Sequence, residues 1–285
     1  MKKAFTRARR LRSLLALCLL ALCLLLPACA RGEEEELAVT FFDAGKADAI
    51  LVRAGEHALL IDAGLNKNGE ELAEAIRAAG VERLDLLLIT HFDKDHVGGA
   101  DAVLAALPVD EVLQPDYFKD SKQMDQYRRA LREAGLTPTV LAENQTRTLG
   151  SATLSIDVAN ADDYGADEEN DFSLVVSLCF GQTRFLFAGD AEEARIAELL
   201  EEGDLAHDVL KAPHHGRAHD NNAEFFGAVG AQFAVITSAD DEREDPETVR
   251  LLEQTGATVL LTRLGTVTIR SDGVRLTVEQ EPAGQ

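Results

Sequence analysis

The stretch THFDKDHVGG, residues 90–99, places side chains that bind metals or protons directly after an apolar run, RLDLLLI. Five of them fall within six positions: His91, Asp93, Lys94, Asp95 and His96. A divalent ion held by imidazole and carboxylate groups lowers the pKa of water from about 16 to about 7 and so supplies hydroxide at neutral pH. We interpret this stretch as part of a hydrolytic metal site.

Other strand ends carry groups of the same kind, and in α/β proteins reactive groups gather at the carboxyl ends of strands. One aspartate at a strand end indicates little, because aspartates also cap turns and helices. Here FFDAG, LIDAG, FAGDAE and KAPHHG each end an apolar run, and they contribute Asp43, Asp62, Asp190, His214 and His215.

The histidines are concentrated in the same segments. Five of the seven lie in or just beyond the strand ends: His91, His96, His214, His215 and His219. His57 and His207 lie elsewhere, and we assign them no role. Clustering of imidazoles with carboxylates predicts that distant segments converge on a metal.

The elements that must position these groups change along the chain from hairpin-like strands to alternating helices and strands, in both halves. RLDLLLIT is nearly unbroken in apolar residues, which indicates a strand buried on both faces. SLVVSLCF and TRFLFAG are separated by GQ and predict a hairpin. This order favours two sheets between helix layers, an α/β four-layer αββα sandwich, with one domain expected over residues 37–280.

The first 29 residues are typical of an export signal, with a basic start, an uncharged Leu-rich stretch and a small-residue end. The apolar part, Ser13–Leu26, is shorter than the roughly 20 residues of a membrane span. LPAC resembles a lipobox, although Pro27 departs from it, and predicts lipidation of Cys29. Residues 30–36 are expected to form an acidic tether. Free secretion and a retained signal anchor are the alternatives to an exported lipoprotein facing outside the cytoplasm.

The chain is acidic, with 28 basic against 50 acidic residues and a net charge of −22. Loss of the six basic residues of the leader would leave 22 against 50, or −28. Such a body repels a long polyanion, so any role on nucleic acid must overcome this repulsion. After export only Cys179 would remain in the body, so no internal disulfide is expected.

THFDKDHVGG, FLFAGDAE and VLKAPHHG together resemble the metallo-β-lactamase fold, in particular the branch formed by the C-terminal domain of the DNA-uptake protein ComEC. FFDAGKADAILVRAG resembles the opening signature of that branch, and NDFSLVV resembles its N-N-x-S-L-V. The similarity runs in order through residues 39–270. It implies a metal-dependent hydrolase on the αββα sandwich.

The resemblance also implies a set of metal ligands. They are His91 and Asp93 for a first ion, Asp95 and His96 for a second, Asp190 between the two, and either His214 or His215 as a late ligand. The wider superfamily has histidine where Asp93 stands, but this branch commonly has aspartate. No histidine completes the first shell, where Asn170 and Asp171 stand instead, so we expect one firm and one labile divalent ion, Zn²⁺ or Mn²⁺.

Further residues are expected around these ligands. Asp95, Asp190 and Lys211 are the predicted catalytic groups. The supporting or substrate-binding set is Asp43, Lys46, Asp48, Asp62, Asn170, Ser173 and Arg217. Lys46 and Arg217 depart from the family pattern, as does Asp245, which replaces a usual histidine. The side chains of Lys46, Lys211 and Arg217 could bind an anionic group of the substrate against the metal, or they could be ordinary surface charges.

The expected function is an exported metal-dependent phosphodiesterase or nuclease. Its substrate would be DNA or a cell-wall phosphodiester, and it would be tied to the membrane by its lipid, with no protein partner evident. Two alternatives stay open: a lactonase or β-lactamase-like hydrolase, and a non-catalytic lipoprotein with a degenerate site, favoured by Asp245 and Arg217.

Overall fold

The computed structural model describes residues 35–161, 164 and 169–283. Glu36–Gln285 forms one compact unit, and Met1–Glu35 is a separate one of which only Glu35 is described. The predicted signal, Cys29 and residues 30–34 of the tether therefore lie outside the described residues. In the part that is described, every helix is too short or too polar to cross a bilayer.

The first sheet has eight strands in the order β15-β14-β1-β2-β3-β4-β5-β6. Neighbours from β15 to β3 are antiparallel, and those from β3 to β6 are parallel. The strands are β1 (Leu37–Phe41), β2 (Ile50–Ala54), β3 (His57–Ile61), β4 (Leu84–Leu88), β5 (Val109–Pro115), β6 (Thr139–Leu141), β14 (Val267–Ser271) and β15 (Leu276–Gln280).

The second sheet repeats this plan with seven strands in the order β13-β12-β11-β10-β9-β8-β7. Strands β7 to β10 pair antiparallel, and β10 to β13 pair parallel. The strands are β7 (Gln145–Leu149), β8 (Ala152–Asp157), β9 (Val175–Phe180), β10 (Thr183–Phe187), β11 (Val209–Lys211), β12 (Phe233–Ile236) and β13 (Thr258–Leu261). The predicted hairpin is confirmed as β9 and β10, whereas β7 was not predicted.

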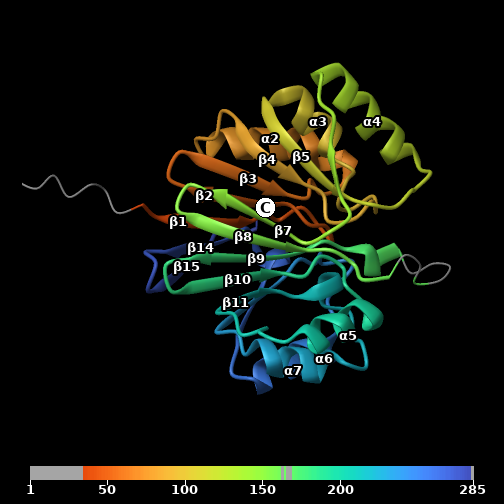
Figure 1. The fold of residues 1–285 in the computed structure, drawn as a ribbon. Helices are drawn as coiled ribbons and strands as arrows, with labels where there is room; N and C mark the ends of the chain where they lie inside the picture. Colours follow the sequence, from red (N-terminus) through yellow and green to blue (C-terminus); the bar gives the residue numbers. More distant parts are fainter. Residues whose placement is uncertain (1–34, 162–163, 165–168, 284–285) are drawn as a thin grey trace, which may run out of the picture. The chain divides into compact units, whose positions relative to one another are not determined.

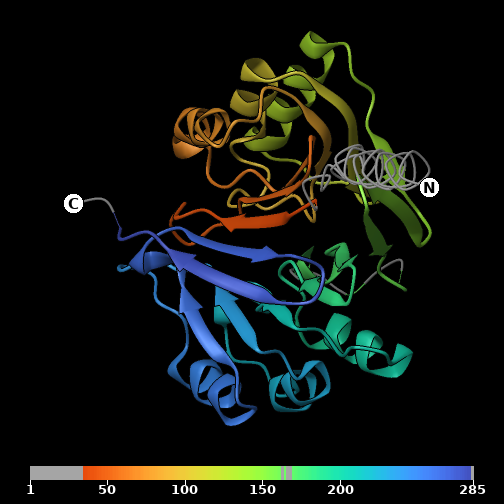
Figure 2. The ribbon, with the colours of Figure 1, turned by 90° about the vertical axis from the view of Figure 1, so that its left-hand side faces the viewer.

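Helices connect the parallel strands and cover the outer face of each sheet, which gives four layers (Figures 1 and 2). The helices are α2 (Gly69–Ala78), α3 (Ala100–Ala106) and α4 (Lys122–Ala134) on the first sheet, and α5 (Glu193–Glu202), α6 (Asn222–Val229) and α7 (Pro246–Gln254) on the second. Four 3-10 turns are η1 (Asn66–Asn68), η2 (Glu169–Phe172), η3 (Pro213–Gly216) and η4 (Thr262–Leu264). The predicted αββα sandwich is confirmed.

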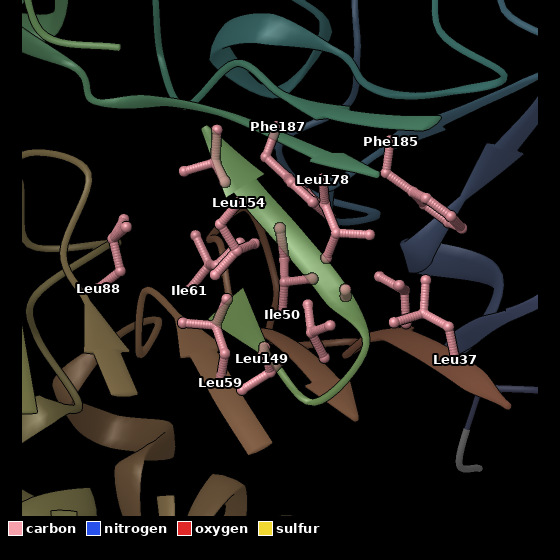
Figure 3. Close-up of a cluster of buried hydrophobic side chains, with 14 of the residues drawn as sticks. Leu37, Ile50, Leu59, Ile61, Leu88, Leu149, Leu154, Leu178, Phe185 and Phe187 are labelled. Atoms are coloured by element: carbon pink, nitrogen blue, oxygen red, sulfur yellow. The ribbon is translucent and has the colours of Figure 1, made fainter. Parts of the chain in front are cut away.

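The main core lies between the two sheets, as Figure 3 shows. Alternate residues of a strand point to opposite faces, so Phe185 and Phe187 enter this core while Leu186 packs under the helices of the second sheet. In β4, Leu88 faces the central core and Leu87 faces the helices. The expected burial of β4 on both faces is confirmed, and the strand ends that carry the polar groups are thus held by packing on two sides.

Candidate metal centre

The polar groups of three motifs meet although they come from both sheets. The loop after β4 carries residues 90–99, the loop after β10 carries Asp190, and η3 follows β11. Gly98 and Gly99 make the first loop possible, because a Cβ on Gly98 would overlap Lys94 O and one on Gly99 would overlap Ala63 O. Close backbone contact of this kind is available only to glycine.

The turn η3 has an unusual backbone. His214 has φ 44° and ψ 50°, and His215 has φ 53° and ψ 28°, so two consecutive non-glycine residues adopt the left-handed conformation. Each such residue costs about 1 kcal/mol or more and persists only where surrounding structure enforces it. This backbone conformation points the two neighbouring imidazoles in different directions, and the planes of their rings make an angle of 68°.

Four donor atoms are spaced as the ligands of one ion. Nε2 of His215 lies 3.1 Å from Asp190 Oδ2 and 3.5 Å from Asp95 Oδ2. Nε2 of His96 lies 3.2 Å from Asp190 Oδ2 and 3.4 Å from His215 Nε2. Ligands held at about 2.0–2.2 Å by a tetrahedral zinc ion lie about 3.4 Å apart. This group therefore fits a divalent ion.

The hydrogen bonds of the histidines leave their Nε2 atoms available. Nδ1 of His96 donates to Asp62 Oδ2 at 2.8 Å. Nδ1 of His215 lies 2.9 Å from Thr237 Oγ1, which donates its own proton to Asp48 and must therefore accept from the imidazole. Such partners fix the tautomer of metal-bound histidines in known sites. Asp48 and Asp62 thus lie behind the donor group.

His91 adds a fifth donor. One ligand atom of His91 lies within 4.8 Å of ligand atoms of His96 and Asp190. Its Nδ1 is close to Thr90 Oγ1 and Ser173 Oγ, at 3.2 and 3.4 Å, whereas its buried Nε2 has no hydrogen-bond partner among the described residues. A buried polar atom without a partner is costly, so a cation at this point would stabilise it. Burial, followed by the nearby His96, lowers the pKa of His91 to about 3 and keeps its imidazole neutral, as a ligand requires.

The pKa values of Asp190 and His96 are determined by the charged groups around them. Burial alone would raise the pKa of Asp190, but His215, His96 and Lys211 hold it well below its usual range. Burial opposes protonation of His96, yet Asp190 and Asp62 raise its pKa well above the ordinary value. These opposite shifts show that the carboxylates of the centre favour a positive charge between them.

Lys211 lies beneath the donor group and is fully buried. Its ammonium contacts Asp48 Oδ2 at 2.5 Å, Gly189 O at 2.9 Å and Asp190 Oδ1 at 3.4 Å. Its N–H donors are thus occupied by protein groups, so this buried ammonium group is not placed to bind an anionic substrate. The contacts instead hold Asp48 and Asp190 in place.

The first ion site of the family pattern is altered. Asp93 pairs with Lys119, which also pairs with Glu169, so an ammonium group lies beside the carboxylate that the resemblance assigned to a metal. Asn170 donates to Glu192 Oε1 at 3.0 Å and does not replace the missing histidine. Among the described residues, Asp93 belongs to none of the clusters of His, Asp and Glu side chains that could bind a metal ion.

Other predicted residues lie at varying distances from the donors. Ser173 Oγ accepts from the backbone N–H of Asp190 at 3.1 Å. Asp43 is exposed, and its backbone N–H donates to Thr266. The side chain of Arg217 is 65% exposed, 3.9 Å from Glu192. Lys46 is partly buried and makes no hydrogen bond or ion pair to the donors in the described ranges.

His214 and Asp245 have positions that the sequence left open. Of the two late histidines, His215 joins the donor group, while Nδ1 of His214 lies 2.8 Å from Glu192 Oε1. Asp245 precedes α7 and its carboxylate accepts from the backbone N–H of Glu247 at 2.9 Å. Asp245 is thus a helix cap, a role that aspartate commonly has.

The sequence reasoning missed several supporting residues. Thr90 and Thr237 orient the imidazoles of the centre, and Lys119 and Glu192 form ion pairs at its margin. Both threonines directly end apolar strand runs, LLLIT and AVIT, which was the available signal. Nothing in the local sequence indicates the ion pairs, because their partners lie far along the chain.

Comparison with known proteins agrees with this geometry. The pattern of the metallo-beta-lactamase superfamily matches residues 43–226. Competence protein ComA of Neisseria gonorrhoeae is 29% identical over 210 residues, which cover 72% of this chain and 27% of the relative. ComE operon protein 3 of Bacillus subtilis (strain 168) is 25% identical over 255 residues, covering 81% of this chain and 33% of the relative. The chain thus spans about a quarter to a third of the length of these curated relatives.

A solved structure shows the same fold. It is the metallo-beta-lactamase fold protein YhfI from Bacillus subtilis, with a TM-score of 0.52 and 12% sequence identity. The match covers 79% of this chain and 96% of that chain. At this identity the likeness concerns the fold alone.

Proposed function

This chain belongs to the metallo-beta-lactamase superfamily, and from that premise we propose that it is a metal-dependent phosphodiesterase. The observation that carries the proposal is the donor group of Asp95, His96, Asp190 and His215, with neighbouring atoms 3.1–3.5 Å apart. A divalent ion bound there would supply Lewis acidity and lower the pKa of water.

The residues of the chain have distinct parts in this proposal. Asp95 is the most accessible of the four donors, with 18% of its side chain exposed, so substrate approaches from its side. Burial would raise the pKa of Asp95, but a hydrogen bond from His215 and the charge of His96 lower it and keep the carboxylate ionised, as a ligand requires. Lys211 is a positioning residue that holds Asp190 through Oδ1 and leaves Oδ2 facing the imidazoles.

Two features support a phosphodiester as the substrate. One of the relatives reported above is named a competence protein, and the sequence motifs resemble the domain of a DNA-uptake protein. The aspartate at position 93 and the missing histidine of the first site leave fewer imidazoles than the wider superfamily pattern has. The acidity of the chain favours a short phosphodiester, such as a cell-wall head group, over a long polyanion.

The test is hydrolysis of bis-p-nitrophenyl phosphate by the purified full chain with Mn²⁺, with Zn²⁺ and with EDTA. We expect turnover that requires metal and falls by about 100-fold or more in Asp190→Ala, since a ligand of the ion is removed. His57→Ala, on an exposed histidine, is the matched control and should keep full activity. Turnover of nitrocefin or a lactone without turnover of the phosphodiester would replace the proposal by the carboxyl-hydrolase alternative. Equal, metal-independent rates in wild type and Asp190→Ala would favour a binding protein.

The cellular location is part of the proposal as well. The basic, Leu-rich start and the LPAC segment support an exported lipoprotein carrying its lipid on Cys29. Intact mass of the mature protein tests this, because lipidation would add a diacylglyceryl mass to a chain beginning at Cys29. A mature protein that retains Met1 would contradict it.

A further inference from the structure

A second cluster of ligand-type side chains lies next to the metal centre and is formed around His214, the late histidine that does not join the main donor group. Glu192, His214 and His219 each place one ligand atom within 4.8 Å of the others. Glu192 directly precedes α5, His214 lies in η3 and His219 lies in the loop before α6. Two imidazoles and one carboxylate are the ligand set of many zinc sites that keep a fourth position open.

The contacts within the cluster point to a missing cation. Nδ1 of His214 lies 2.8 Å from Glu192 Oε1, but this contact is not aligned as a hydrogen bond, and Nδ1 has no hydrogen bond among the described residues. Nε2 of His219 is buried and has no hydrogen-bond partner in the described part of the chain. The side chains of His214 and His219 are only 9% and 8% exposed, so water does not readily satisfy these nitrogens.

Buried polar atoms without a hydrogen bond are concentrated in the chain segment that carries His214 and His219. Among the described residues, nine buried side-chain atoms lack a partner, and four of them belong to the nine-residue segment 214–222. The atoms are His214 Nδ1, His219 Nε2, Asn221 Oδ1 and Asn222 Oδ1. Buried polar groups are normally hydrogen-bonded, and the two imidazole nitrogens of this segment are atoms that a cation at the cluster would satisfy.

The surrounding structure holds the cluster in position. Asp171 is buried, and its carboxylate accepts from the backbone N–H groups of Glu192 and Arg195 at 2.8 and 3.2 Å. Asn222 is fully buried and donates to Arg217 O at 2.9 Å, which ties down the loop that carries His219. Both anchors act on the backbone and leave the ligand side chains free to rotate toward an ion.

We propose that Glu192, His214 and His219 bind a zinc ion at a site separate from the Asp95–His96–Asp190–His215 centre. Ligands of a tetrahedral zinc ion lie about 3.4 Å apart, so small side-chain rotations suffice to close the site. The altered first site of the family pattern, where Lys119 pairs with Asp93, does not hold this ion.

The position of the site suggests its use. Nε2 of His214 lies 4.0 Å from Asp190 Oδ2, so the second ion lies beside the main centre, where an anionic substrate oxygen can approach both. Arg217 is 3.9 Å from Glu192 and largely exposed. This use rests on the proposed phosphodiesterase function, whereas zinc binding itself does not.

The test is zinc stoichiometry of the purified full chain after chelator treatment, reloading with zinc, gel filtration and elemental analysis. We expect about two zinc ions per wild-type chain and about one in His219→Ala, because a three-ligand site does not survive loss of an imidazole. Glu192→Gln should likewise retain about one and provides a conservative second variant if His219→Ala does not fold.

Two controls locate the ion. His57→Ala removes an exposed histidine paired with Asp85 and should leave the wild-type stoichiometry unchanged. Asp93→Asn should also leave it unchanged, because the first site of the family pattern is not used. The proposal would be overturned if the wild type bound only one zinc ion per chain. It would also be overturned if neither His219→Ala nor Glu192→Gln lost a zinc ion, or if Asp93→Asn did lose one. A chain with two zinc ions but no phosphodiester turnover would refute the function and leave this site standing.

Discussion

Lys211→Met is expected to destabilise the protein strongly. Lys211 and Asp48 are buried, with 0% and 1% of their side chains exposed, and their charged atoms are 2.5 Å apart. Removing one partner of a buried ion pair leaves the other charge without compensation and costs about 3–5 kcal/mol. Methionine has a similar length and preserves the packing of the aliphatic stem. The decrease in the free energy of unfolding therefore reports the removal of the ammonium charge.

The assay is urea unfolding of wild type and variant in EDTA, because a bound metal would contribute its own stabilisation. A loss of 3–5 kcal/mol corresponds to a fall in melting temperature on the order of 10 °C for a chain of this size. Asp48→Asn in the Lys211→Met background should recover at least about 1 kcal/mol, since neighbouring groups couple by about 0.5–3 kcal/mol.

The control is Lys122→Met, which alters an exposed lysine at the start of α4 and should change stability by less than about 0.5 kcal/mol. A loss below about 1 kcal/mol in Lys211→Met, or no recovery in the double variant, would refute the view that Lys211 stabilises the carboxylates beneath the centre.

Three further predictions concern single residues. Asp62→Asn replaces the carboxylate that accepts from His96 Nδ1 by a neutral amide and should weaken zinc binding about 10–100-fold in a chelator competition, with unchanged affinity as the contrary result. Burial lowers the pKa of His207, so its unfolded form binds the proton more readily and the contribution of His207 to the unfolding free energy should fall as pH drops below 6.5. In His207→Gln this slope should flatten; an identical slope would refute the assignment. Gly98→Ala should cost about 1–3 kcal/mol in urea unfolding because its Cβ overlaps backbone, whereas Gly227→Ala in α6 has free space and should gain about 0.5–1 kcal/mol.

Much of the fold could be predicted from local sequence. The run RLDLLLIT is buried on both faces in β4, and the GQ link joins β9 and β10, because these features depend on hydrophobic pattern and turn chemistry alone. Strand β7, QTRTL, was missed since its polar residues carry no clear alternation. Pairing with β8 determines its structure, and that contact is not visible in the strand itself.

The metal centre, too, has features that local sequence predicts and features that only tertiary contacts determine. The residue types and the strand ends predicted that His96, Asp190 and one of the two late histidines would bind a cation, and the structure brings His96, Asp190 and His215 together. Two adjacent histidines are equivalent in sequence, however, and only the left-handed backbone of η3 turns His215 toward the donors and His214 toward Glu192. Long-range packing selects that backbone against its local cost, which no short-range pattern encodes.

The sequence by itself determined the class of fold and the kind of chemistry, because periodicity and ligand-type side chains are properties of short segments. The tertiary structure decided which charges compensate one another: Lys211 beneath Asp48 and Asp190, and Lys119 beside Asp93. Electrostatic interactions depend on distance and burial, and both are set only when the two sheets close around the centre.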